Sequence, residues 1–142
     1  MNLVRNDTAQ LDILLIEDDE VDVMNVQRSF RKNGVRHHLR IAHDGLQALE
    51  MLRSHAVALP QVILLDINMP RMGGLEFLRE LRQDPRLCSI AVFIMSTSDN
   101  PIDKATAYQY NVAGYIVKPL SAEKFNQAIT KLVAFWEICE FV

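Results

Sequence analysis

Cysteine is scarce in this 142-residue chain, and its two cysteines, Cys88 and Cys139, lie far apart with no CxxC pair. This scarcity argues against a disulfide framework and a cysteine-ligated zinc site. We therefore expect the two cysteines to be small apolar residues of the core, in a protein from a reducing compartment. Basic residues are not in excess either, because 15 Lys and Arg face 18 Asp and Glu, a formal charge of −3. This balance provides no basic surface for nucleic acid or for an anionic membrane.

Long apolar runs are also missing. No run approaches the roughly 18 residues that a membrane span requires, and the first seven residues lack the apolar core of a secretory signal. We therefore expect a soluble cytoplasmic protein that binds neither membranes nor nucleic acids. Hydrophobic residues make up 49% of the chain, and its length suits one domain at roughly 100–200 residues per domain.

What the sequence does contain is a regular alternation of short apolar runs with helical periodicities. The predicted strands lie at residues 13–16, 38–42, 62–65, 90–95 and 114–117. Each is followed by apolar residues at helical spacing, such as Leu75, Leu78 and Leu81. Five strand–helix units in alternation predict an α/β fold, with a parallel sheet covered by helices on both faces.

Polar and charged side chains follow the predicted strands at the edge where such sheets bind ligands. They are Glu17, Asp18, Asp19, Asp66, Ser96 and Lys118. Two carboxylates about 4 Å apart repel each other by roughly 4 kcal/mol at an effective dielectric constant near 20, so a cation is needed among them. Few carboxylates with room for water favour Mg²⁺ over Ca²⁺. A metal, a carboxylate, a hydroxyl and an ammonium together indicate phosphoryl transfer to a carboxylate.

Each of these residues also has an ordinary structural interpretation. Asp19 has about even odds of being a helix N-cap, and Asp18 is a similar case. Asp66 suits a turn, Ser96 suits a turn or cap, and Lys118 suits a solvated surface. The coincidence of such residues at four strand ends favours a functional site over four separate structural roles.

Four motifs in order resemble the receiver domain of two-component response regulators. They are Ile-Glu-Asp-Asp at 16–19, Leu-Asp-Ile-Asn-Met-Pro at 65–70 with Gly-Gly at 73–74, Ser-Thr at 96–97, and Gly-Tyr-Ile-Val-Lys-Pro at 114–119. The resemblance covers residues 11–138 and implies a flavodoxin-like, doubly wound five-stranded parallel sheet in the order 2-1-3-4-5, with five helices. We expect an extension at 1–10 and a receiver domain at 11–142 that ends in an apolar helix extension.

The resemblance also implies a role for each matching residue. Asp66 accepts a phosphoryl group from a sensor histidine kinase. Mg²⁺ is bound by Asp18, Asp66 and the backbone carbonyl of Asn68, with Glu17 acting through water. Lys118 forms an ion pair with the phosphoryl group. The peptide bond between Lys118 and Pro119 is expected to be cis.

Further residues are expected to respond to the phosphoryl group. Ser96 and Tyr115 form the switch, while Thr97, Ser98 and Asn68 modulate it. The output is a protein-binding surface on the fourth helix, fifth strand and fifth helix, which binds a downstream protein that the sequence does not identify.

The carboxyl-terminal residues are unusually apolar for the end of an amphipathic helix. We expect an association surface there and a homodimer. The residues are Phe135, Trp136, Ile138, Phe141 and Val142. Such an ending resembles that of stand-alone response regulators of phytochrome kinases, so a phytochrome-type kinase is the expected partner.

Other functions use the same architecture. A Mg²⁺-dependent aspartate phosphatase requires a second aspartate two residues after its nucleophile, where this chain has Asn68. A flavin binder requires a phosphate-binding loop after the first strand, where this chain has three acids. An interaction module that is independent of phosphorylation remains an alternative. We expect no enzyme activity beyond self-catalysed phosphotransfer and autodephosphorylation.

Overall fold

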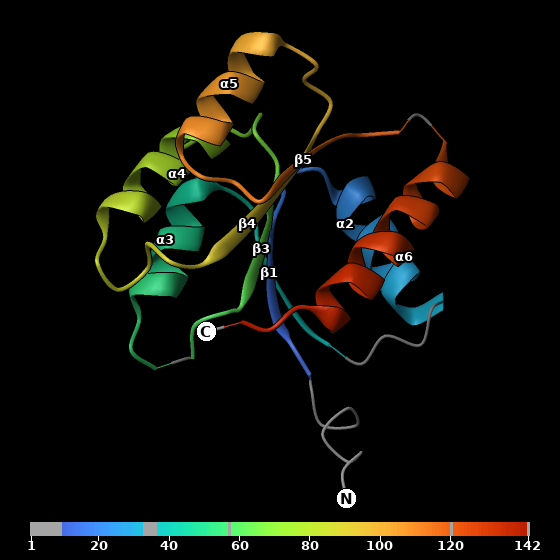
Figure 1. Ribbon diagram of the computed structural model, residues 1–142, viewed down its shortest axis with the longest axis horizontal. Coiled ribbons are helices and arrows are strands. Elements are labelled where there is room, and N and C mark those ends of the chain that lie inside the picture. Colours follow the sequence, from blue (N-terminus) through green and yellow to red (C-terminus); the bar gives the residue numbers. More distant parts are fainter. Residues whose placement is uncertain (1–9, 33–36, 57, 120, 142) are drawn as a thin grey trace, which may run out of the picture.

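A computed structural model describes residues 10–32, 37–56, 58–119 and 121–141, which form one sheet with helices on both sides (Figure 1). The strands are β1 (Asp12–Ile16), β2 (His38–Ala42), β3 (Val62–Leu65), β4 (Ala91–Ser96) and β5 (Gly114–Val117). The helices are α2 (Glu20–Lys32), α3 (Gly45–Arg53), α4 (Gly74–Gln83), α5 (Pro101–Gln109) and α6 (Ala122–Ile138). Within these residues, no helix is long and apolar enough to cross a membrane.

The five strands are parallel and lie in the order β2-β1-β3-β4-β5. Both the fold class and the strand order predicted from the sequence are therefore confirmed. Because all strands run the same way, their carboxyl ends meet at one edge of the sheet. This edge brings together the loops that follow β1, β3, β4 and β5.

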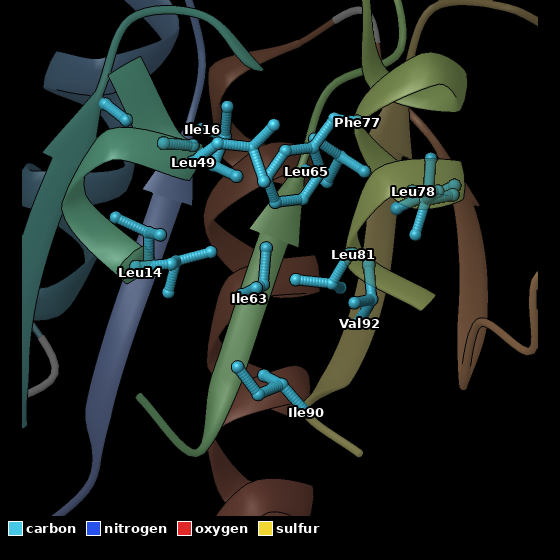
Figure 2. Close-up of a cluster of buried hydrophobic side chains, with 14 of the residues drawn as sticks. Leu14, Ile16, Leu49, Ile63, Leu65, Phe77, Leu78, Leu81, Ile90 and Val92 are labelled. Atoms are coloured by element: carbon cyan, nitrogen blue, oxygen red, sulfur yellow. The ribbon is translucent and has the colours of Figure 1, made fainter. Parts of the chain in front are cut away.

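Alternate residues of each central strand contribute to two separate cores, which explains the continuous apolar runs. Leu14 and Ile63 pack under α3, α4 and α5 (Figure 2), whereas Ile13 and Leu64 pack under α2 and α6. Figure 1 shows these helix groups on opposite sides of the sheet. Because both faces are buried, the strand-end side chains have a rigid base.

The apolar end of α6 divides between core and surface. Trp136 is only 1% exposed and lies edge-on to Phe93, with ring centroids 5.6 Å apart. The expectation that Trp136 contributes to an association surface is therefore wrong for this chain, because its indole fills the core beside β4. Phe135 and Ile138 are 49% and 79% exposed, and Phe141 packs against the core in part.

Two of the sequence-based expectations fall on residues without described positions. Val142, the last residue of the expected association surface, lies outside the described residues, as do residues 1–9 of the expected extension. The exposed apolar end of the chain is accordingly represented by Phe135 and Ile138.

Candidate functional site

Three acidic residues meet at the carboxyl edge of the sheet. Glu17 and Asp18 directly follow β1, and Asp66 directly follows β3. One carboxylate oxygen from each residue lies within 4.8 Å of the others. Glu17 and Asp66 are buried, while Asp18 is exposed, so the cluster is open to solvent on one side.

Burial dominates the electrostatics of this cluster. It raises the pKa of Glu17 from 4.5 to about 7, against the opposing effect of a hydrogen bond from Lys118. Burial also raises the pKa of Asp66, and the positive charge of Lys118 acts in the opposite direction. Two buried carboxyl groups that resist ionisation gain from a cation placed among them.

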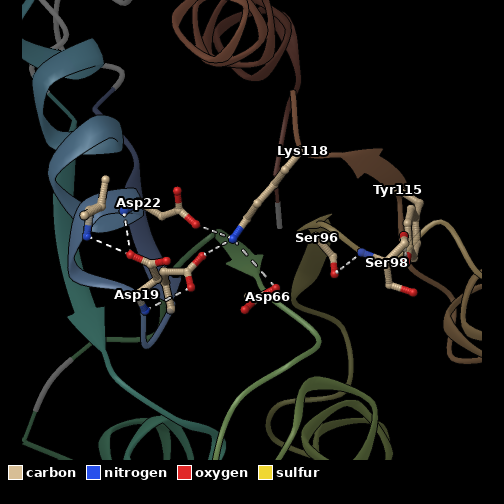
Figure 3. Close-up of polar contacts among 9 residues, drawn as sticks. Asp19, Asp22, Asp66, Ser96, Ser98, Tyr115 and Lys118 are labelled. Carbon is tan, nitrogen blue, oxygen red and sulfur yellow. Dashed lines mark hydrogen bonds and ion pairs between the residues drawn. The ribbon is translucent and has the colours of Figure 1, made fainter. Parts of the chain in front are cut away.

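Lys118 supplies positive charge from the far side of the site (Figure 3). Its Nζ atom donates to Glu17 Oε1 at 2.7 Å and to Asp22 Oδ2 at 2.6 Å, and it lies 3.8 Å from Asp66 Oδ1. Burial alone would lower the pKa of Lys118, but the hydrogen bonds to Asp22 and Glu17 outweigh burial and raise it. Lys118 is therefore firmly cationic.

Asp22 is the residue of this site that sequence reasoning missed. It lies in the first turn of α2, where an acidic residue is ordinarily explained by the helix dipole. The available signal was its position five residues after Glu17, in the first turn of the helix that follows β1, which keeps its carboxylate near the strand edge. Nothing in the pattern connected it with Lys118, which lies 96 residues away.

Asp19 caps the amino end of α2. Its Oδ1 accepts the backbone N–H of Val21 at 2.8 Å and that of Asp22 at 3.3 Å, which satisfies the free donors at the start of α2. Its own backbone N–H donates to Glu17 Oε2 at 3.1 Å. The N-cap interpretation of Asp19 is therefore confirmed, and this cap fixes the start of α2 beside the acidic cluster.

The loop after Asp66 is held by neighbours on two sides. A side chain on Gly74 would place its Cβ 2.4 Å from the Asp66 carbonyl oxygen, so only glycine allows α4 to begin this close. The Arg71 guanidinium binds Asp44, whose Oδ1 also caps α3 through the Gln47 N–H at 2.8 Å. The hydrogen bond from Gln47 and the contact with Arg71 lower the pKa of Asp44. Asn68 is exposed within this loop.

The opposite side of the site contains the hydroxyl groups. Ser96 is fully buried, and its Oγ accepts the Ser98 N–H at 3.1 Å. The Tyr115 hydroxyl donates to the Ser98 carbonyl at 2.8 Å (Figure 3). The Lys118 backbone N–H donates to the Ser96 carbonyl at 2.7 Å, which joins the ends of β4 and β5. Thr97, which lies between Ser96 and Ser98 in the sequence, is exposed.

The Lys118–Pro119 peptide bond differs from the expectation. The described residues contain no cis peptide bond, so this bond is trans. The trans form is intrinsically favoured before proline by about 0.5–1 kcal/mol, and the backbone bond from Lys118 to Ser96 is made without a cis turn.

The acidic cluster fits a divalent cation. All its donors are carboxylate oxygens, the ligands that hard cations such as Mg²⁺ prefer. Burial raises the pKa of Glu17 and of Asp66, so a cation placed among the carboxylates would favour their ionised form. The exposed side at Asp18 is accessible to water.

Comparison with known proteins gives one consistent result. Residues 13–130 match the response regulator receiver domain. Response regulator Rcp1 of Synechocystis sp. is 33% identical over 128 residues, which cover 87% of each chain. The probable methanogenesis regulatory protein FilR2 of Methanothrix harundinacea is 33% identical over 127 residues, covering 87% of this chain and 82% of FilR2.

Solved structures agree with the sequence relatives. The phosphorylated cyanobacterial phytochrome response regulator RcpA has a TM-score of 0.88 at 31% identity, covering 94% of this chain and 99% of RcpA. The Mn²⁺-bound form of Rcp1 has a TM-score of 0.87 at 31% identity, covering 93% and 99%. The similarity therefore extends over nearly the full length of both structures.

Proposed function

Because this chain belongs to the response regulator receiver family of two-component systems, we propose that it accepts a phosphoryl group on Asp66 from a sensor histidine kinase. Receiver domains of this family are signalling modules that pair with histidine kinases. The observation that carries the proposal is the position of the Asp66 carboxylate, which lies beside those of Glu17 and Asp18 and 3.8 Å from the Lys118 ammonium.

In the proposed transfer, an oxygen of Asp66 attacks the phosphorus of a phosphohistidine in line with the leaving nitrogen. A P–O bond forms as the P–N bond breaks, and the electron pair of that bond remains on the imidazole, which then takes up a proton. Lys118, 3.8 Å from Asp66, attracts the negative charge on the phosphoryl oxygens.

Mg²⁺ is the cofactor that we assign to the acidic cluster. Asp18, Asp66 and the backbone carbonyl of Asn68 would hold it, with Glu17 acting through water. When bound, it supplies positive charge to the phosphoryl oxygens. The cluster of Glu17, Asp18 and Asp66 supports this assignment, as does the relative Rcp1, whose structure contains Mn²⁺.

The response is proposed to begin at Ser96. Its Oγ accepts a hydrogen bond from Ser98, so its own proton is free to turn toward a phosphoryl oxygen. Tyr115 follows because its hydroxyl is bound to the Ser98 carbonyl in this structure. Movement of these groups shifts α5 and β5, while Thr97, Ser98 and Asn68 modulate how readily the site reacts and hydrolyses.

The proposed output is protein association through α5, β5 and α6. Each of these elements carries exposed apolar side chains, among them Ile102, Val117 and Ile138. We propose a homodimer and an unidentified downstream protein on this face. A phytochrome-type kinase is the proposed source of the phosphoryl group, supported by the similarity to phytochrome response regulator RcpA.

The domain proposed for this activity spans residues 11–142, preceded by an extension at 1–10. The family match ends at residue 130, but α6 continues to Ile138 and places Trp136 in the core. The burial of Trp136 supports including the carboxyl-terminal segment in the proposed domain.

Labelling by acetyl phosphate tests the function directly. We expect Mg²⁺-dependent phosphorylation that Asp66→Asn abolishes, since the amide is not nucleophilic. Asp19→Asn is the matched control, because it removes a charge nearby but keeps the α2 cap. A wild-type protein that gains no label in Mg²⁺, or an Asp66→Asn variant that labels normally, contradicts the proposal.

A further inference from the structure

We propose that Asp22 is a positioning residue that holds the Lys118 ammonium away from Asp66. It thereby lowers the affinity of the site for a phosphoryl group on Asp66. This inference rests on the proposed phosphorylation of Asp66. It concerns a residue outside the acidic cluster.

The geometry of the Lys118 ammonium is the first argument. Its hydrogen-bond partners are Asp22 at 2.6 Å and Glu17 at 2.7 Å, whereas Asp66 lies at 3.8 Å, beyond hydrogen-bond distance. Figure 3 shows Nζ between the carboxylates of Asp22 and Asp66. A phosphoryl oxygen on Asp66 must therefore draw Nζ toward itself against the attraction of Asp22.

The second argument is that the backbones of both Asp22 and Lys118 are held, so that a change of partner must come from the long Lys118 side chain. The backbone N–H of Asp22 donates to the capping carboxylate of Asp19. The backbone of Lys118 is bound to Ser96 at 2.7 Å, which leaves four methylene groups to move the ammonium. The Lys118 side chain is 8% exposed and that of Asp22 is 22% exposed, so water screens the pair weakly.

The third argument separates Asp22 from Glu17. Glu17 shares its carboxylate with the acidic cluster, but Asp22 does not belong to that group. Asp22 therefore does not have to share its carboxylate between Lys118 and a cation in this cluster. A charge-assisted hydrogen bond of this kind is about twice as strong as a neutral one.

Binding of the phosphoryl analogue beryllofluoride in the presence of Mg²⁺ tests the inference, measured by titration calorimetry. Asp22→Asn keeps the shape of the side chain and removes its charge, so we expect affinity to rise by about three- to tenfold, as for loss of one competing charge-assisted bond. Asp19→Asn, which removes a charge from the same turn and keeps the cap, should bind like the wild type.

A second measurement shows whether the effect passes through Lys118. In a Lys118→Met background, Asp22→Asn should leave the reduced affinity unchanged, because the competing ammonium is gone. Equal gains in Asp22→Asn and Asp19→Asn would overturn the inference in favour of a general charge effect. A loss of affinity in Asp22→Asn would overturn it as well, because Asp22 would then assist Lys118.

Failure of the proposed function has a different result. If the wild-type protein does not bind beryllofluoride in Mg²⁺, both the proposed phosphorylation of Asp66 and this inference are contradicted. If the wild type binds beryllofluoride and Asp22→Asn binds it with the same affinity, only the inference about Asp22 is contradicted.

Discussion

The buried carboxyl group of Glu17 should make the stability of the protein depend on pH. Because the pKa of Glu17 rises from 4.5 to about 7 on folding, the folded protein binds more protons than the unfolded chain between these values. The free energy of unfolding without metal should therefore fall as pH rises from about 4.5 to 7. We expect a loss on the order of 2 kcal/mol from this residue.

Urea unfolding in EDTA at pH 5 and pH 8 measures this effect. Glu17→Gln carries no ionisable group at this position, so its stability should fall less over the same interval. Mg²⁺ should stabilise the wild type more at pH 8 than at pH 5, since the cation requires ionised carboxylates. Equal pH dependence in wild type and Glu17→Gln would show that Glu17 is not the source.

The positions of these residues were predictable to different degrees. Glu17, Asp66 and Lys118 follow apolar runs directly, so the rule that parallel strands end at one edge brings them together without knowledge of side-chain conformation. Asp22 was not predictable in this way, because its contact with Lys118 depends on how α2 leaves the sheet. Trp136 was misjudged because one apolar stretch supplied both core and surface, and sequence alone does not show which side chain turns inward.

At the scale of elements, Asp44 joins α3 to the loop that follows Asp66. Its carboxylate caps α3 and binds Arg71. Asp44→Ala should lower the free energy of unfolding by about 1–2 kcal/mol, the usual cost of a lost N-cap. Asp44→Asn should lose less, because it keeps the cap and gives up only the ion pair with a largely exposed guanidinium.

Chemical denaturation of the two variants at low and high salt measures these contributions. The difference between wild type and Asp44→Asn should shrink in 1 M salt, where charges are screened. Equal losses in Asp44→Ala and Asp44→Asn would assign the stability to the ion pair and not to the cap.

Elements were the most predictable level of this structure. Apolar runs of four to six residues marked the central strands because both faces of the sheet are covered. The geometry of the Lys118–Pro119 bond was not predictable, since cis and trans differ little before proline.

At the scale of the whole molecule, exposed apolar residues on α5 and α6 predict self-association. Ile102 and Ile138 are 73% and 79% exposed, so a charge at either position should disrupt an interface without disturbing the core. If the wild type forms the proposed dimer, we expect Ile102→Glu and Ile138→Glu to shift it toward monomer in sedimentation velocity. A shortened chain is unsuitable, because ending it at Leu132 removes Trp136 from the core.

Leu46→Glu provides the matched control for this experiment. Leu46 is 42% exposed on α3, away from the proposed interface, so its variant should sediment like the wild type. A dimer that survives both Ile102→Glu and Ile138→Glu would place the interface elsewhere.

The location of Trp136 has a consequence for spectroscopy. It is the sole tryptophan of the chain, and it lies near the carboxyl end of α6 against Phe93. Figure 1 shows that α6 runs in the direction opposite to the strands, so its carboxyl end lies away from the strand ends that carry the acidic cluster. The emission spectrum of Trp136 therefore reports whether the core is packed, and it should stay constant while the carboxylates bind a cation, so folding and ligand binding can be followed as separate optical signals.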